Sequence, residues 1–196
     1  MTPRTESEAL FEAFCASHRL DWAPQETATT PTPDCRLIVS GTTVCVEVKQ
    51  IESDAGFKPG GVHSRTVGDH VRRKIAEARE QLQPVSLAGF PTILLVYNSV
   101  DPFQIFGTEI HDFVCAMYGE WTVRLRNGRI EESFHGRNSS VRRNANTSFS
   151  AVGHLVRTEH GAKVKLIENV HARNSLPYGD LPECFEVMRV ELENAA

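Results

Sequence analysis

The segment from residue 33 to residue 49 restricts the possible folds of this chain more than any other part of the sequence. Two apolar runs rich in β-branched residues, Leu37–Val39 and Val44–Val48, are separated by the polar sequence Ser40-Gly41-Thr42-Thr43. Runs of this kind on either side of a glycine-containing turn signal are typical of a β-hairpin. The segment therefore predicts two antiparallel strands.

Alternation along the hairpin predicts one apolar face and one more polar face. If Gly41 and Thr42 form the centre of the turn, Val39 pairs with Val44, and Asp34 lies opposite Lys49 and diagonal to Glu47. A slip of one residue would mix the two faces, so the pattern supports this register. The expected core face holds Cys35, Leu37, Val39, Val44, Val46 and Val48, and the other face holds Asp34, Arg36, Ile38, Cys45, Glu47 and Lys49.

Two carboxylates and a lysine at one end of an apolar hairpin indicate a cation site. A pair of partly buried carboxylates repels itself and must be desolvated, so it usually coordinates a cation. A small set of oxygen ligands suits Mg²⁺ or Mn²⁺, which keep several waters and bind substrate phosphates. A neighbouring lysine can orient the attacking water. These groups are suited to metal-assisted hydrolysis of phosphodiester bonds.

Pro33-Asp34, followed on the next strand by Glu47-Val48-Lys49, resembles the signature of the PD-(D/E)xK nuclease superfamily. The resemblance implies an α/β protein with a restriction-endonuclease-like core of helix, three-stranded meander, helix and strand. It also implies that Asp34, Glu47 and the backbone carbonyl of Val48 bind the metal, and that Lys49 orients the water. Without the resemblance, the segment is an ordinary surface hairpin with an Asp34–Lys49 ion pair, which is worth little.

A helix is expected from about Thr5 to Arg19, with Leu10, Phe11, Phe14 and Cys15 as its apolar stripe. Members of the superfamily often direct an acidic residue of this helix at the metal, and Glu8 matches that placement best. Glu12, one turn further along, is the second choice. Thr5-x-x-Glu8 is also a capping box, in which Glu8 would bond to the start of its own helix.

The elements that follow the hairpin occur in the order that the resemblance implies. A helix capped by Asp69 is expected to run to about Gln83, with Val71, Ile75, Ala78 and Leu82 facing inward. Residues 92–97 form an apolar run typical of a strand that is covered on both faces. A helix over 109–118, a hairpin over 121–134 and strands near 148–156, 162–167 and 185–190 complete the expected elements. We expect a nuclease-like core over 5–118 and a β-rich elaboration over 119–196, packed on that core as one domain over 1–196.

Residues 50–68 are expected to form a long loop that leaves directly from the metal site. The loop and the helix after it carry Lys58, Arg65, Arg72, Arg73 and Lys74, which could contact a nucleic-acid backbone. Lys74 is also a candidate to reach the site, because related nucleases often direct a Lys or Gln from this helix toward the metal. The alternatives are a surface loop without a role and a solvated charged helix face.

Composition bounds the remaining possibilities. A chain of 196 residues with 40% hydrophobic content supports one well-formed domain. The net charge of −4 does not indicate nucleic-acid binding, although positive charge gathers between Lys58 and Lys74 and between Arg124 and Arg143. Five cysteines without a C-x-x-C pair, a polar N-terminus and apolar runs of strand length lead us to expect a cytoplasmic protein with reduced thiols and no membrane contact.

The sequence therefore predicts a Mg²⁺- or Mn²⁺-dependent nuclease with nucleic acid, above all DNA, as its substrate. We expect endonuclease rather than exonuclease action, and a homodimer is compatible with the resemblance because two sites can cut two strands. One alternative is a non-catalytic nucleic-acid-binding or interaction module that retains the fold. Another is an assembly protein whose Glu47–Lys49 face makes a subunit contact.

Overall fold

The computed structural model describes residues 5–25, 31–52 and 65–190. Within these ranges the helices are α1 (Glu6–Ser17), α2 (Asp69–Leu87) and α3 (Ile110–Tyr118). The strands are β1 (Asp21–Pro24), β2 (Cys35–Val39), β3 (Thr42–Ile51), β4 (Thr92–Asn98), β5 (Trp121–Arg126), β6 (Arg129–His135), β7 (Ala151–Thr158), β8 (Gly161–Glu168) and β9 (Phe185–Met188). The expected α/β class is confirmed, as is the order of helix, three strands, helix and strand.

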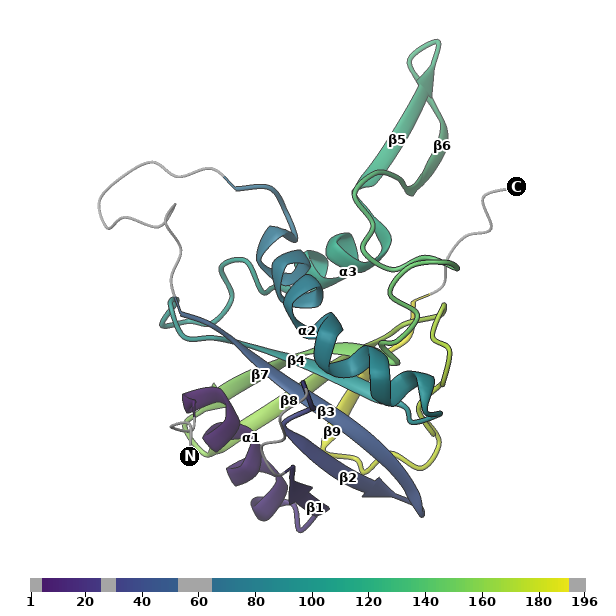
Figure 1. Ribbon diagram of the computed structural model, residues 1–196. Coiled ribbons are helices and arrows are strands. Elements are labelled where there is room, and N and C mark those ends of the chain that lie inside the picture. Colours follow the sequence, from purple (N-terminus) through teal and green to yellow (C-terminus); the bar gives the residue numbers. More distant parts are fainter. Residues whose placement is uncertain (1–4, 26–30, 53–64, 191–196) are drawn as a thin grey trace.

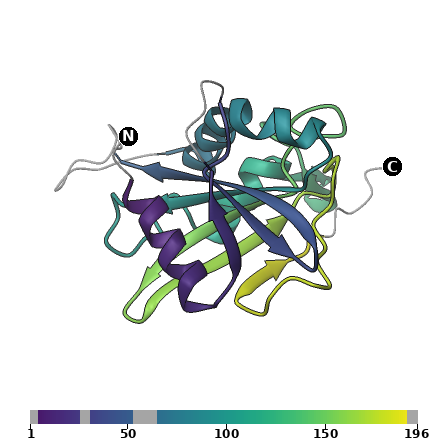
Figure 2. The ribbon, with the colours of Figure 1, turned by 60° about the horizontal axis from the view of Figure 1, so that its bottom comes forward.

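One mixed sheet forms the centre of the molecule, and its strand order is β1-β2-β3-β4-β7-β8-β9. The first three strands are antiparallel, whereas β3, β4 and β7 are parallel neighbours. Helix α1 covers one face, and α2 and α3 cover the other (Figures 1 and 2). The sheet is thus the middle of three layers, an arrangement that buries β4 completely, as its continuous apolar sequence predicted.

The hairpin of β2 and β3 is present, but its expected register is wrong by two residues. Val39 pairs with Thr42 rather than with Val44, because the turn consists of Ser40 and Gly41 alone. Both turn residues have positive φ angles, 47° and 80°, as a tight two-residue hairpin turn requires. A shift of two residues leaves every side chain on its original face. The register that follows sets Asp34 opposite Glu47 instead of Lys49.

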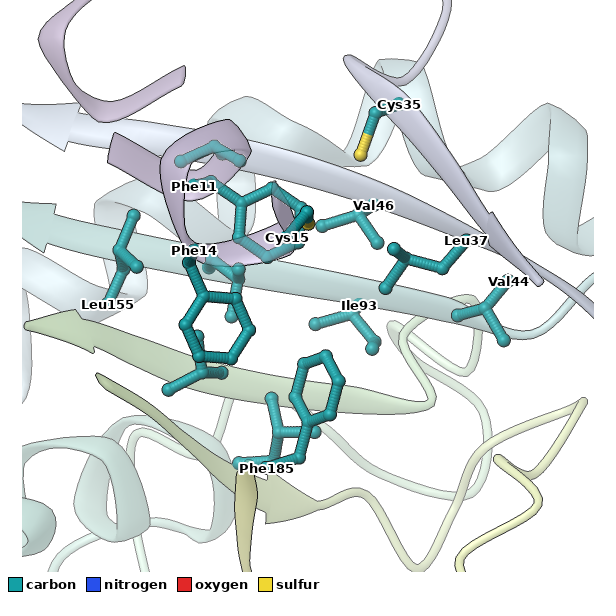
Figure 3. Close-up of a cluster of buried hydrophobic side chains, with 14 of the residues drawn as sticks. Phe11, Phe14, Cys15, Cys35, Leu37, Val44, Val46, Ile93, Leu155 and Phe185 are labelled. Atoms are coloured by element: carbon teal, nitrogen blue, oxygen red, sulfur yellow. The ribbon is translucent and has the colours of Figure 1, made fainter. Parts of the chain in front are cut away.

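The first core lies between α1 and the sheet (Figure 3). Phe14 of α1 meets Phe185 of β9 edge to face, with the ring centroids 5.4 Å apart. All six residues of the expected core face of the hairpin are buried, and so is the expected apolar stripe of α1. The short edge strand β1, for which the sequence signal is poor, pairs with β2 and ends at Pro24, where a proline is tolerated.

The second core lies between the sheet and the α2–α3 layer. The four residues expected to face inward from α2 are fully buried. Asp69 does not cap this helix: it is the first helical residue, and Gly68 takes the cap position with φ of 82°. Because α2 covers the face of β3 that was expected to be polar, Cys45 and Glu47 are buried there, each 1% exposed.

The C-terminal strands continue the central sheet and do not form an elaboration packed on a finished core. Strand β7 pairs with β4, and β8 and β9 extend the sheet from there. The ranges 5–118 and 119–196 therefore share one sheet. Among the described residues, only the β5–β6 hairpin forms a separate sheet, and it projects from the body (Figure 1). In the described part of the chain, no helix combines the length and the apolar character needed to cross a membrane.

Candidate metal centre

The candidate site lies where β3 runs past the beginning of β2. The pairing of these two strands ends at Cys35 and Val46. Asp34 stands just before β2, and Glu47, Val48 and Lys49 continue along β3 beside it. The structure thus brings together the four residues that the resemblance names.

Asp34 and the backbone of Val48 meet directly. The Asp34 Oδ2 atom accepts a hydrogen bond of 2.6 Å from the Val48 N–H. In an antiparallel ladder the N–H and C=O of one residue point to the same side of the strand. The Val48 carbonyl therefore faces the same edge of β3 as Asp34, beyond the last residue that β2 pairs. This geometry agrees with the expected use of that carbonyl as a ligand.

Glu47 is a buried carboxylate with one unused oxygen. Its Oε1 atom lies 2.5 Å from the Lys49 Nζ atom. Its Oε2 atom is buried and has no hydrogen-bond partner among the described residues. An unsatisfied buried carboxylate oxygen is costly and rare in native proteins. The oxygen is suited to a ligand that protein atoms do not supply.

Burial makes both carboxylates hard to ionise. Desolvation, together with the neighbouring charge of Asp34, raises the pKa of Glu47 to about 7 against the opposing effect of Lys49. Desolvation likewise raises the pKa of Asp34 to about 6, although the Val48 N–H favours its ionised form. Two coupled carboxylates of this kind gain most from a divalent cation, which neutralises both. The donor set of carboxylate and carbonyl oxygens fits Mg²⁺ or Mn²⁺.

Lys49 is held between the sheet and α2. Besides its ion pair with Glu47, its amine donates to the side-chain oxygen of Gln81 at 3.0 Å, when the Gln81 amide takes the orientation that satisfies both its atoms. In that orientation the Gln81 nitrogen donates to the Glu77 carbonyl at 3.0 Å. The Lys49 side chain is still 22% exposed. The amine is therefore held in place by two partners, while part of the side chain is exposed.

Gln81 is the functional candidate that sequence reasoning missed. The sequence groups it with Lys74 on one flank of α2 and favours Lys74 as the residue that reaches the site. In the structure Lys74 donates to Glu77 at 2.7 Å and lines a separate small pocket, of about 230 Å³, with Arg73. The signal was available, because Lys74 and Gln81 lie two helical turns apart on the same side of the helix.

Glu8 adopts the capping box. Its backbone N–H donates to Thr5 Oγ1 at 3.3 Å, and its Oε2 atom accepts from the Thr5 N–H at 3.4 Å. The same carboxylate lies close enough to Asp34 to raise its pKa. Glu8 therefore contributes negative charge to the site while one of its oxygens bonds to its own helix. Glu12 lies half-buried on the same helix.

The expected nucleic-acid contacts divide into three groups. Lys58 lies outside the described residues. Arg65 and Arg72 have their donors taken up by the protein: Arg65 binds both carboxylate oxygens of Asp112, and Arg72 donates to Asp69 and to three backbone carbonyls. Their role is to join α2 and the segment before it to α3 and to the loop after β6. Arg73 is exposed near the end of β3, whereas Lys74 beside it is half-buried and paired with Glu77.

Glu109, His111 and Asp112 form an acidic group elsewhere, at the start of α3. Asp112 is fully buried, and its oxygens accept from Arg65, from the Gly68 N–H at 2.9 Å and from the Glu109 N–H at 3.2 Å. Its role is structural.

Comparisons of this chain with protein-family models, with curated proteins and with solved structures find no match.

Proposed function

We propose that this protein is a metal-dependent nuclease that hydrolyses phosphodiester bonds, with DNA as the expected substrate. The observation that carries the proposal is the buried, unpartnered Oε2 atom of Glu47, which lies in a site with Asp34, the Val48 carbonyl and Lys49. A purely structural ion pair would need only one acceptor for Lys49. Here the Asp34 carboxylate is buried beside that of Glu47, at a cost in free energy. A divalent cation that binds both carboxylates would offset this cost.

The fold supports the same proposal. Helix α1, the antiparallel strands β1, β2 and β3, helix α2 and strand β4 follow one another in the order that the PD-(D/E)xK resemblance implies. Strand β4 pairs in parallel with β3, on the edge opposite to β2. We propose that this part of the chain is a restriction-endonuclease-like core, completed by β7, β8 and β9 within the same sheet.

Asp34, Glu47 and the Val48 carbonyl would hold Mg²⁺ or Mn²⁺. When bound, such an ion lowers the pKa of a coordinated water and offsets charge on the phosphoryl oxygens. Lys49 would hold and orient the attacking water beside the two carboxylates, and its positive charge would stabilise charge that develops on the phosphate. Gln81 is a positioning residue, because its side-chain oxygen fixes the Lys49 amine.

The test is a cleavage assay with linear duplex, single-stranded and branched DNA and with RNA, each in Mg²⁺, in Mn²⁺ and in EDTA. We expect metal-dependent cleavage, lost in Asp34→Asn, Glu47→Gln and Lys49→Met. Matched controls are Glu80→Gln on the exposed side of α2 and Lys163→Met on β8, both of which should cleave like the unchanged protein. Cleavage that survives in Asp34→Asn and Lys49→Met would reject the mechanism, and nucleic-acid binding without cleavage in either metal would favour a non-catalytic binding module.

A further inference from the structure

A second hollow, of about 480 Å³, lies beside the C-terminal half of α2. Its wall carries one arginine from each of three separate segments: Arg79 from α2, Arg142 from the loop before β7, and Arg173 from the loop after β8. Most of the other residues that line it have hydroxyl or amide side chains, among them Asn144, Asn146 and Thr147. No aspartate or glutamate is among the described residues that line it. We call it the arginine pocket.

The walls of the arginine pocket are fixed by the fold. Arg142 and Ala145 exchange two backbone hydrogen bonds, of 3.0 and 3.1 Å, across a tight turn. The Arg173 N–H donates to the Thr147 carbonyl at 2.7 Å, and the Asn146 side chain donates to the Ser140 carbonyl at 2.8 Å. Buried side chains anchor both ends of this loop, Val141 on one side and Phe149 on the other. The pocket is therefore formed before any ligand enters it.

Half of the other twelve arginines in the described part of the chain pair with a carboxylate, whereas the three exposed arginines of the pocket do not. Arg65, Arg72, Arg124, Arg126, Arg157 and Arg189 each pair with a carboxylate. Within residues 5–25, 31–52 and 65–190, the guanidinium groups of Arg79, Arg142 and Arg173 form no ion pair and no side-chain hydrogen bond. Three like charges around one hollow repel one another unless an anion lies between them.

We propose that the arginine pocket binds the phosphate group of a phosphate ester. Guanidinium groups present several N–H donors in a planar fork that matches phosphate oxygens, and neighbouring hydroxyl and amide groups can complete the set. The pocket is separate from the metal centre. Arg79 and Gln81 are two residues apart in α2, about 200° around the helix axis, so their side chains leave nearly opposite sides of the helix. The phosphate can come from a nucleic-acid backbone or from a small phosphate compound. This inference goes beyond the proposed nuclease activity and does not depend on it.

The test uses the full chain in EDTA, so that binding is measured without cleavage. Titration calorimetry measures the affinity for pyrophosphate, and fluorescence anisotropy measures the affinity for a labelled oligonucleotide. The test variant is Arg142→Gln with Arg173→Gln, and the matched control is Arg19→Gln, an exposed arginine just after α1 on the opposite face of the sheet. Each lost charge-assisted contact should weaken phosphate binding by about tenfold. The control should bind like the unchanged protein.

The outcomes separate the sources and the proposals. Weaker binding of both ligands by the test variant supports a pocket for the nucleic-acid backbone, and weaker binding of pyrophosphate alone supports a pocket for a small phosphate compound. Equal affinities of the test variant and the unchanged protein for both ligands would overturn the proposal, as would no binding of either ligand. If the double variant fails to fold, the single variant Arg79→Gln, at an exposed position of α2, is measured in the same two binding assays. Phosphate binding that depends on the arginine pocket, without metal-dependent cleavage, would support the pocket and reject the nuclease proposal. Metal-dependent cleavage without such binding would support the nuclease proposal and reject the pocket.

Discussion

At the residue scale, Glu47 is a buried carboxylate that lowers the stability of the protein. Residue Glu47 is 1% exposed and its carboxylate has one unpartnered oxygen, so the ion pair with Lys49 offsets only part of the desolvation cost in the metal-free protein. The pKa of Glu47 is raised to about 7 even beside Lys49, so its ionised form costs stability at pH 8. We therefore expect the neutral Glu47→Gln side chain to raise the free energy of unfolding in EDTA at pH 8 by roughly 1–3 kcal/mol. Urea unfolding followed by circular dichroism measures this difference.

The same variant should no longer be stabilised by Mg²⁺. A ligand that binds only the folded protein stabilises it in proportion to the logarithm of its concentration over Kd. The unchanged protein should therefore become more stable as Mg²⁺ is raised, and Glu47→Gln should not. Glu80→Gln, on the exposed side of α2, should respond to Mg²⁺ like the unchanged protein. Equal Mg²⁺ stabilisation of Glu47→Gln would exclude Glu47 as a ligand.

The raised pKa values of Asp34 and Glu47, about 6 and about 7, predict an inverted pH dependence for the metal-free protein. An unfolded carboxyl group loses its proton near pH 4. Between that pH and 7 the folded state holds more protons than the unfolded state, so the free energy of unfolding should fall as pH rises. The affinity for Mg²⁺ should rise over the same range, because the ion competes with protons.

His154 contributes with the opposite sign and must be separated from the carboxylates. Burial lowers the pKa of its imidazole to about 4, so its contribution to stability rises with pH from 4 to about 6.5. The measurement is therefore the difference between the unchanged protein and the Asp34→Asn, Glu47→Gln double variant, unfolded with urea in EDTA from pH 5 to pH 8. A difference that does not vary with pH would contradict the raised pKa values.

Sequence reasoning found the chemical groups of the site but not all of their partners. Asp34, Glu47 and Lys49 stand out because charged residues interrupt an apolar hairpin, which is a local signal. The turn of Ser40 and Gly41 was harder to place, because the larger polar turn over 40–43 keeps the same faces. The contact between Gln81 and Lys49 depends on how α2 crosses β3, and no pattern within either segment determines that crossing.

At the scale of elements, Asp112 fixes the N-terminus of α2 to α3. Its buried carboxylate accepts from the Arg65 guanidinium and from the Gly68 and Glu109 backbone N–H groups. Removing one partner of a buried ion pair leaves an uncompensated charge, so Asp112→Ala should lower the free energy of unfolding by about 3–5 kcal/mol. Asp69→Ala, which removes an exposed partner of Arg72, should cost about 1 kcal/mol or less.

Urea unfolding of the two aspartate variants measures this contrast, and similar costs for both would contradict the anchoring role of Asp112. Gly68→Ala offers an independent check of the same junction. A Cβ atom there would lie 2.8 Å from the Ala116 nitrogen and from the Asp112 carbonyl oxygen, and φ at Gly68 is 82°. The sequence predicted both helices from their apolar periodicity. It could not predict their junction, because Arg65 and Asp112 are remote in sequence.

At the scale of the whole molecule, the strand order decides which parts of the chain can fold alone. Sequence reasoning divided the chain into a core over 5–118 and an elaboration over 119–196, because the expected motif is complete by residue 97. The central sheet spans both of these ranges, because β7 pairs with β4. The first core also includes Ala151, Leu155 and Phe185 from the second range. Parallel pairing between distant strands leaves no local signal, which is why the order of the sheet could not be predicted.

The division of the chain leads to a prediction about truncation. A fragment that ends at Tyr118 would expose the β7 edge of β4, a strand whose seven residues are all buried, and would remove part of both cores. We therefore expect this fragment to be unfolded or aggregated. Replacing residues 121–135 with a short glycine-rich link should leave the protein folded, because within the ranges that the structure describes β5 and β6 pair only with each other, and Trp121, Leu125 and Ile130 are exposed. Circular dichroism and cooperative urea unfolding distinguish the two results. A cooperatively folded 118-residue fragment would mean that the N-terminal half is a complete domain, and loss of folding on removal of the hairpin would mean that β5 and β6 support the sheet.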